Sequence, residues 1–175
     1  MTTQTLTHAS TVETPEARGL IRRALLSLTT TTSSAAPLLA RLALAAVIFP
    51  HGAQKAFGWF GGHGYEGTMG FFTQSMGISA PLAFLAILTE SLGAVALALG
   101  ILARPAALAT AVTMVVAAVL AHLPNGFFMN WSGAAQGEGF EFHILAVALA
   151  VIVLVWGGGR WSVDRRLASA LRARS

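Results

Sequence analysis

The chain places a few hydrophilic side chains inside segments that are otherwise almost entirely apolar. Glu90 stands about ten residues into an apolar run of about twenty, close to the middle of a lipid bilayer if that run is a membrane-spanning helix. A charge at that depth costs roughly 3 kcal/mol on insertion scales. We therefore expect Glu90 to be paired, hydrated or protonated, and to point into a bundle of helices.

A second group of chemically capable residues lies in the preceding apolar run. His51, Gln54 and Lys55 are spaced i, i+3 and i+4, so they share one face of a helix, and Pro50 beside them would bend that helix. Imidazole, amide and ammonium groups bind polar ligands and, in the case of His and Lys, exchange protons. His51 and Glu90 differ in predicted depth by only about 5 Å, so we expect these two side chains to face each other.

Two further apolar runs contribute polar residues at the same end. His122 and Asn125 close one run, and Glu141 and His143 open the next. The candidate intramembrane pocket therefore consists of His51, Gln54, Lys55, Glu90, His122, Asn125, Glu141 and His143. The alternative is that such residues only hydrogen-bond helices together, with those near the boundary reaching toward the headgroups. The catalytic residue, if there is one, stays unknown.

Metal and thiol chemistry are disfavoured. His51, Glu90 and His122 carry atoms that bind metals, but no two histidines lie at i, i+4 on one helix, so we predict no metal site and no haem bound by two histidines. The chain has no cysteine, which excludes thiolate nucleophiles, disulfides, Cys-ligated metals and iron–sulfur clusters.

The composition is that of a membrane protein. Of the 175 residues, 55% are hydrophobic and 10% charged, whereas a soluble domain carries about 25% charged residues. Four apolar segments of about 17–21 residues match the ~20 residues needed to cross ~30 Å of hydrocarbon. We expect these spans at about 37–57, 80–100, 105–123 and 140–156.

The predicted fold is all-α, an integral membrane four-helix bundle extended by shorter elements at its ends. Residues 1–36 form an N-terminal tail that contains a basic amphipathic segment, expected either to lie on an anionic membrane surface or to be a solvated tail. Residues 37–164 form the membrane domain, and 165–175 a basic tail. A short amphipathic helix should begin near Ser162, with Asp164 supporting its N-terminus.

The distribution of positive charge predicts the orientation. All ten arginines fall on the side that holds both termini and the short loop after the second span, and only Lys55 falls on the other side. Cytoplasmic loops carry an excess of Lys and Arg. We therefore expect a multi-pass protein of the bacterial inner (plasma) membrane with both termini in the cytoplasm.

Five ordered sequence pieces resemble the DoxX family of small bacterial membrane proteins. They are RLALAAVIFPHGAQKAFGWFGGHG, TESLGAVALALGILARPAAL, HLPNGFF, GFEF and GGGRWSVD, which together run from Arg41 to Asp164. The resemblance implies a four-helix inner-membrane protein linked to membrane-associated oxidoreductase assemblies. Without cysteine, any redox role of this chain would have to use a bound quinone or the cofactor of a partner.

Three functions compete at this point. The first is a quinone-interacting or accessory subunit of an oxidoreductase system, in which His51, Lys55 and Glu90 would bind the quinone. The second is a pathway for protons or a small solute, and the third a non-catalytic scaffold or assembly factor. Whether the chain is an enzyme is left open. Expected partners are the lipid bilayer, oxidoreductase proteins and a second copy of the chain, and no nucleic acid.

Overall fold

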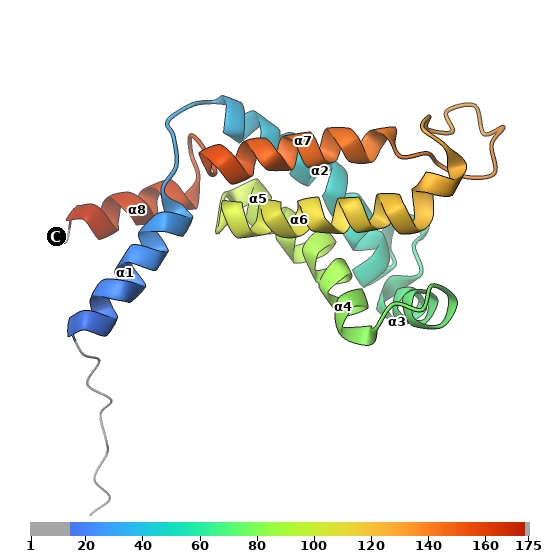
Figure 1. Ribbon diagram of the computed structural model, residues 1–175, viewed down its shortest axis with the longest axis horizontal. Helices are drawn as coiled ribbons and strands as arrows, with labels where there is room; N and C mark the ends of the chain where they lie inside the picture. Colours follow the sequence, from blue (N-terminus) through green and yellow to red (C-terminus); the bar gives the residue numbers. More distant parts are fainter. Residues whose placement is uncertain (1–14, 174–175) are drawn as a thin grey trace, which may run out of the picture.

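The structure, a computed structural model, describes residues 15–173, and within them every regular element is helical (Figure 1). Helix α2 spans Ala36–Phe57. The second long helix consists of α4 (Ala80–Leu88), the π-helical turn η3 (Thr89–Gly93) and α5 (Ala94–Leu99). The third consists of α6 (Ala103–Ala117), the π-helical turn η4 (Ala118–His122) and η5 (Leu123–Asn125), and the fourth is α7 (Glu141–Trp156). The predicted all-helical membrane bundle is confirmed.

The four helices differ in length. Within residues 15–173, three are long and apolar enough to cross a membrane, namely Ala36–Phe57, Ala80–Leu99 and Ala103–Asn125. Helix α7 has 16 residues. At 1.5 Å per residue it spans about 24 Å, less than the ~30 Å of hydrocarbon in a typical bilayer. Because α7 is shorter than the hydrocarbon core, the residues that follow it lie close to the boundary between hydrocarbon and headgroups.

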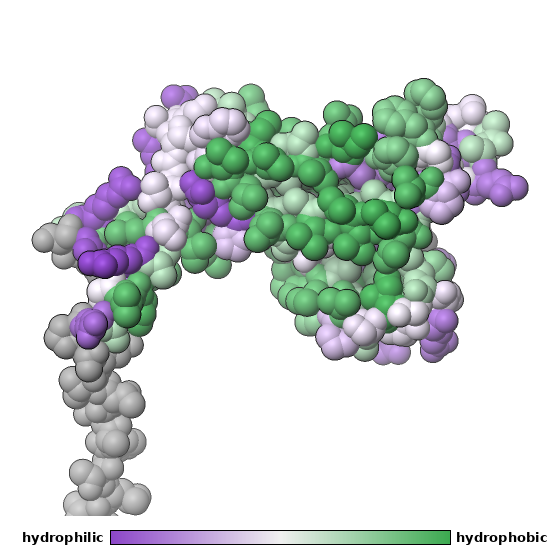
Figure 2. Space-filling view, in the orientation of Figure 1, coloured by the Kyte–Doolittle hydropathy of each residue, from purple (hydrophilic) through white to green (hydrophobic). Residues whose placement is uncertain are grey.

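Small side chains allow the helices to pack closely. Ala103, Ala107 and Ala150 are completely buried where α6 and α7 meet, and Leu44 and Ile48 of α2 fill the remaining space. In lipid, helix association depends on such close packing because lipid tails are as apolar as leucine. The larger apolar side chains instead cover the outside of the bundle, and hydrophilic residues gather at its ends (Figure 2).

Short helices lie at both ends of the bundle. At one end, α1 (Pro15–Thr29) and α8 (Val163–Ala173) pack against each other, and the Arg22 Nη2 group donates a 3.1 Å hydrogen bond to the Leu171 carbonyl (Figure 1). At the other end lie η1 (Trp59–Gly61), α3 (Gly64–Gly70), the π-helical η2 (Phe71–Ser75) and the long 126–140 loop. The predicted amphipathic segment near the N-terminus is thus a helix, and it packs on α8.

A buried arginine joins the α8 end to the bundle. Arg41 of α2 is 2% exposed, and its guanidinium donates to the carbonyls of Gly158 (2.8 Å), Leu97 (2.9 Å) and Ala98. Gly100, at a φ of 66°, lies so close that a Cβ there would stand 2.5 Å from the Cβ of Ser162. Only glycine fits this left-handed, crowded position without strain. Arg41 therefore holds together the ends of three long helices.

Asp164 lies in the first turn of α8, as the sequence predicts, but its side-chain hydrogen bonds go to a different helix. Ser162 caps α8 instead, because its hydroxyl oxygen accepts the Arg165 N–H at 3.2 Å. The carboxylate of Asp164 turns to α6 and accepts the backbone N–H groups of Leu102 and Ala103, both at 2.8 Å. Burial raises the pKa of Asp164, and these two hydrogen bonds act against that shift. Asp164 is near the starts of two helices, because the fold brings the first turn of α6 alongside that of α8.

Candidate functional site

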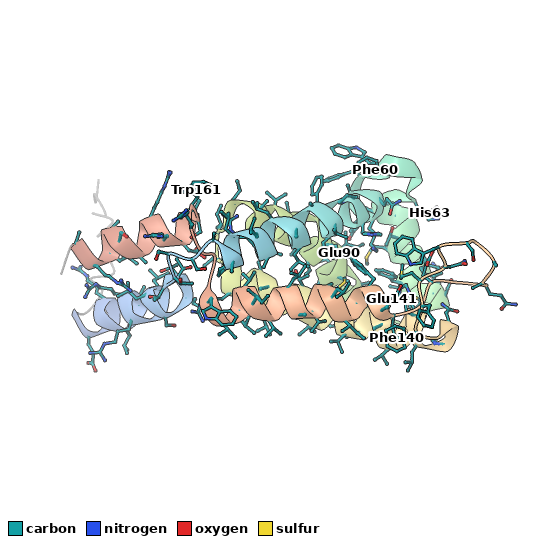
Figure 3. The ribbon with its side chains drawn as sticks, turned by 90° about the horizontal axis from the view of Figure 1, so that it is seen from above. Phe60, His63, Glu90, Phe140, Glu141 and Trp161 are labelled. Carbon is teal, nitrogen blue, oxygen red and sulfur yellow. The ribbon has the colours of Figure 1, made fainter. Side chains whose placement is uncertain are left out.

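The centre of the site is an ion pair inside the bundle. Glu90 is 5% exposed, and its Oε2 atom accepts a hydrogen bond from the Nζ of Lys55 on α2. The side chain of Lys55 is 26% exposed. Figure 3 shows Glu90 between the helices and away from both ends of the bundle. Glu90 thus hydrogen-bonds Lys55, while His51 is within electrostatic range of Glu90 and their predicted facing stays a prediction.

Two local features of the backbone bring this pair together. Glu90 belongs to the π-helical turn η3, where Ser91 donates its hydroxyl hydrogen to the Ile87 carbonyl at 2.6 Å. Opposite this turn is Gly52, where a Cβ would lie 2.1 Å from the Glu90 carbonyl oxygen. The two backbones are therefore in contact, and Lys55 is close to one helical turn beyond Gly52. π-Helical turns occur frequently at functional sites because they re-aim a side chain within a helix.

His51 lies beside the pair rather than within it. Its ring is tilted against that of Phe142 on α7, with centroids 6.5 Å apart, and the residue is exposed. It is nevertheless within electrostatic range of both Lys55 and Glu90. His51 thus stands between the ion pair and the fourth helix, on the lateral surface of the bundle.

Two more histidines meet next to Phe142. The rings of His122, on η4, and His143, on α7, have centroids 4.2 Å apart. His143 is 6% exposed, and its Nδ1 atom has no hydrogen-bond partner among the residues that the structure describes. The Nδ1 atom of His122 is 2.9 Å from the Glu138 carbonyl oxygen. An unpaired buried imidazole nitrogen is a group that can still accept or donate a proton.

The remaining candidates fasten loops. Gln54 donates to the Phe60 carbonyl at 3.3 Å, which ties α2 to η1. Asn125 donates to the Glu138 carbonyl at 3.1 Å, and Glu141 accepts the Met129 N–H at 3.0 Å. These contacts hold the 59–61 and 126–140 segments over the end of the bundle.

The eight candidates therefore divide into three sets. Lys55 and Glu90 form the ion pair, His51 lies within electrostatic range of both, and the rings of His122 and His143 contact each other. The loop-fastening residues are Gln54, Asn125 and Glu141. Within the described residues, no three His, Asp or Glu side chains are arranged to hold a metal ion.

Sequence reasoning missed the residues that shape the site rather than act in it. The helix-crossing role of Gly52 leaves no trace in composition, since glycine is common in this chain. The η3 turn has one signal, a Ser next to Glu90 in an apolar helix, because Ser hydroxyls often bond the preceding carbonyls. From the sequence, Arg41 serves only to predict the orientation. In the structure its side chain is buried and donates hydrogen bonds to backbone carbonyls.

The two helices that form the ion pair lie within the part of the chain that matches a known protein family. The sequence profile of the DoxX family matches residues 36–123, which is half of the chain and covers α2 to η4. The chain belongs to the DoxX family. Neither a curated protein nor a solved structure shows a significant match. Together with its apolar helices, the family identifies this DoxX protein as a membrane protein.

The matched region contains only part of the site. Lys55, Glu90 and His122 lie inside it, whereas Glu141 and His143 of α7 lie beyond its end. The ion pair is therefore built entirely from the DoxX-matched part of the chain. The imidazole of His143 is added by the fourth helix.

Proposed function

We propose that this DoxX protein is a quinone-interacting or accessory subunit of a membrane-associated oxidoreductase system. The single observation that carries the proposal is the Lys55–Glu90 pair, in which a partly buried donor contacts a buried carboxylate inside an apolar bundle. A quinone needs an apolar surface, a hydrogen-bond donor at a carbonyl and a nearby source of protons.

The residues of the site have separable tasks in this proposal. The ammonium of Lys55 offers three hydrogens, of which Glu90 takes one, so it can also donate to a quinone carbonyl oxygen. Glu90 can hold a proton and pass it to that oxygen. The exposed imidazole of His51 lies on the same side of α2 as Lys55 and provides a second donor. A bound quinone would supply the redox chemistry, with electrons coming from a partner oxidoreductase.

The test is extraction of lipids from protein purified in mild detergent, followed by chromatographic measurement of quinone per protein. We expect stoichiometric quinone with the wild type and loss of it in Glu90→Gln and Lys55→Gln. Gln54→Ala is the matched control, since Gln54 is the helical neighbour of Lys55 but binds a loop carbonyl. Absence of quinone from wild-type protein purified out of quinone-containing membranes would refute the proposal.

A second candidate function, a proton pathway, is favoured by a different observation. The buried Nδ1 atom of His143, which has no hydrogen-bond partner within residues 15–173, lies at the same end of the bundle as His122 and His51. Side chains that exchange protons in such a row are typical of proton relays in membranes. Proton flux in liposomes that depends on His143, in protein free of quinone, would favour this function. A scaffold would show neither flux nor quinone.

We also propose that the α1–α8 end of the bundle faces the cytoplasm of a bacterial cell. Nine of the arginines lie in the described residues at or near that end, on α1, α2, α6, α8 and the turn before α8. The opposite end carries Glu66, Glu138 and Glu141, and its one Lys is paired with Glu90. This distribution is the one expected of cytoplasmic and external faces.

A further inference from the structure

An open groove lies at the base of α8, at the end of the bundle opposite the 126–140 loop. Its volume is about 580 Å³, and a smaller depression of about 290 Å³ adjoins it through Arg165 and Ser169. The groove is lined by Arg160, Trp161, Ser162, Arg165, Arg166 and Ser169. We refer to these six residues as the basic groove.

The three arginines of the basic groove have no carboxylate partner within residues 15–173. Arg160, Arg165 and Arg166 are exposed, and their guanidinium groups make no hydrogen bond or ion pair with any described residue. The nearest carboxylate in the sequence, Asp164, is 3% exposed and already accepts two backbone N–H groups of α6. Three guanidinium groups around one groove therefore have no counter-ion in the part of the chain that the structure describes.

The tryptophan of the groove is held in an unusual conformation. Trp161 is 75% exposed and has a φ of 59°, a left-handed value that is rare for a large side chain. Its carbonyl oxygen accepts a hydrogen bond from Arg41 Nη2 at 3.5 Å, and Ser162 next to it is buried. The strain is thus maintained by the bundle, and its result is that the indole points outward at the base of α8 (Figure 3). Indole rings favour the boundary between hydrocarbon and headgroups.

The depth of the groove matches the headgroup layer. Trp161 follows the last residue of α7, Trp156, by five positions, so it lies just beyond the end of the fourth apolar helix. The headgroup region adds about 5–7 Å to each side of the hydrocarbon core. A lipid phosphate would therefore stand at the height of the basic groove.

We propose that the basic groove binds the phosphate headgroup of an anionic phospholipid. Guanidinium groups bind phosphate oxygens through paired hydrogen bonds, which is why Arg is preferred where phosphate is recognised. Trp161 would lie along the upper acyl chain, while Arg160, Arg165 and Arg166 surround the phosphate. The inference uses none of the residues of the ion pair and is independent of the proposed quinone function.

The experiment places the full-length protein in nanodiscs made from equal amounts of phosphatidylglycerol and phosphatidylcholine. The protein is then re-extracted in mild detergent, and the ratio of the two retained lipids is measured. We expect phosphatidylglycerol to be enriched in the wild type. The double change Arg165→Gln and Arg166→Gln should lower the enrichment by about fivefold or more, since each Arg near an anionic surface contributes about that factor.

Matched variants separate the groove from general charge. Arg18→Gln with Arg23→Gln removes the same charge from exposed positions of α1 and should keep the enrichment. Arg165→Lys with Arg166→Lys keeps the charge, and should retain the fold and part of the enrichment even if the Gln variant aggregates. Equal enrichment in the groove and α1 variants overturns the proposal. Inorganic phosphate that raises the thermal stability of the detergent-solubilised protein as much as phosphatidylglycerol does would instead assign the groove to a soluble phosphate ligand.

Discussion

Gly52 of α2 lies against the backbone of Glu90, so close that a Cβ at position 52 would stand 2.1 Å from the Glu90 carbonyl oxygen and 2.4 Å from the Ser91 nitrogen. The contact is made by main-chain atoms, which cannot rotate away as a side chain can. This crossing sets the distance between α2 and η3, and therefore the distance between Lys55 and Glu90. The ion pair depends on a residue that has no side chain.

The first prediction concerns this crossing. Gly52→Ala should lower the free energy of unfolding by about 1–3 kcal/mol, because the added methyl group forces the helices apart. It should also weaken any ligand binding that depends on the ion pair. Gly70→Ala is the control, since Gly70 is helical and a Cβ there meets nothing within 4 Å. Thermal unfolding in detergent measures the stability of both variants. Equal unfolding midpoints for Gly52→Ala and Gly70→Ala would contradict the prediction.

The second prediction concerns the pair itself. Lys55→Met leaves a buried carboxylate without its partner, and we expect a loss of about 3–5 kcal/mol in the free energy of unfolding. Adding Glu90→Leu removes the unpaired charge, so the double variant should recover most of the stability. The double-mutant cycle therefore gives the coupling energy directly.

The outcome also separates structure from function. If the pair serves only to hold helices together, the recovered double variant should retain every cellular phenotype of the wild type. If the pair forms a binding site, the double variant should be stable and yet lack the bound ligand. A single Lys55→Met variant as stable as the wild type would show that Glu90 is protonated or hydrated instead of paired.

Most of the bundle could be predicted from hydropathy. Four runs of apolar residues leave few alternatives to helices, because backbone groups in lipid must be satisfied within the segment. The interruptions were not predictable in this way. The π-helical turns that carry Glu90 and His122 interrupt apolar helices without a break in hydropathy strong enough to predict them, although Ser91 is a local signal for the first.

The candidate site was predictable in composition but not in pairing. The cost of placing Glu90 in lipid identified it as a residue that needs a partner. The predicted depth in the bilayer alone suggests His51 as this partner. Which residue hydrogen-bonds Glu90 also depends on the rotation of α2 about its axis and on the length of the partner's side chain. Lys55 has a long flexible stem, which lets it extend back from the end of the helix to Glu90. Such reach is invisible to a count of residues along a helix.

The third prediction tests the helix cap made at long range by Asp164. Asp164→Ala should lower the free energy of unfolding by about 0.5–2 kcal/mol, because two N–H groups at the start of α6 lose their acceptor. Ser169→Ala is the control, since the Ser169 hydroxyl donates to the carbonyl of Arg165 in its own helix. If both changes have the same small effect on the thermal midpoint, the cap contributes nothing measurable.

The fourth prediction concerns the terminal segments. Deleting residues 1–30 or 165–175 should leave the protein in the membrane fraction, because the four apolar helices lie outside both segments. The first deletion also removes the Arg22–Leu171 contact between α1 and α8, so we expect lower thermal stability without loss of insertion. Fractionation of membranes checks the first expectation. A truncated protein found in the soluble fraction would mean that the terminal helices are needed for insertion.

The last prediction is the orientation of the bundle. Reporter fusions at Gly62 and Gly133 should read as external, and a fusion at Ser175 as cytoplasmic. The physical reason is the excess of arginine at the α1–α8 end, which the membrane potential and anionic lipids retain on the cytoplasmic side. Gly62 and Gly133 lie in the two connections at the opposite end of the bundle, between the first and second and between the third and fourth long helices. They must report the same side if all four helices cross. If the fusions at Gly133 and Ser175 both read as external, the 16-residue α7 between them does not cross the membrane.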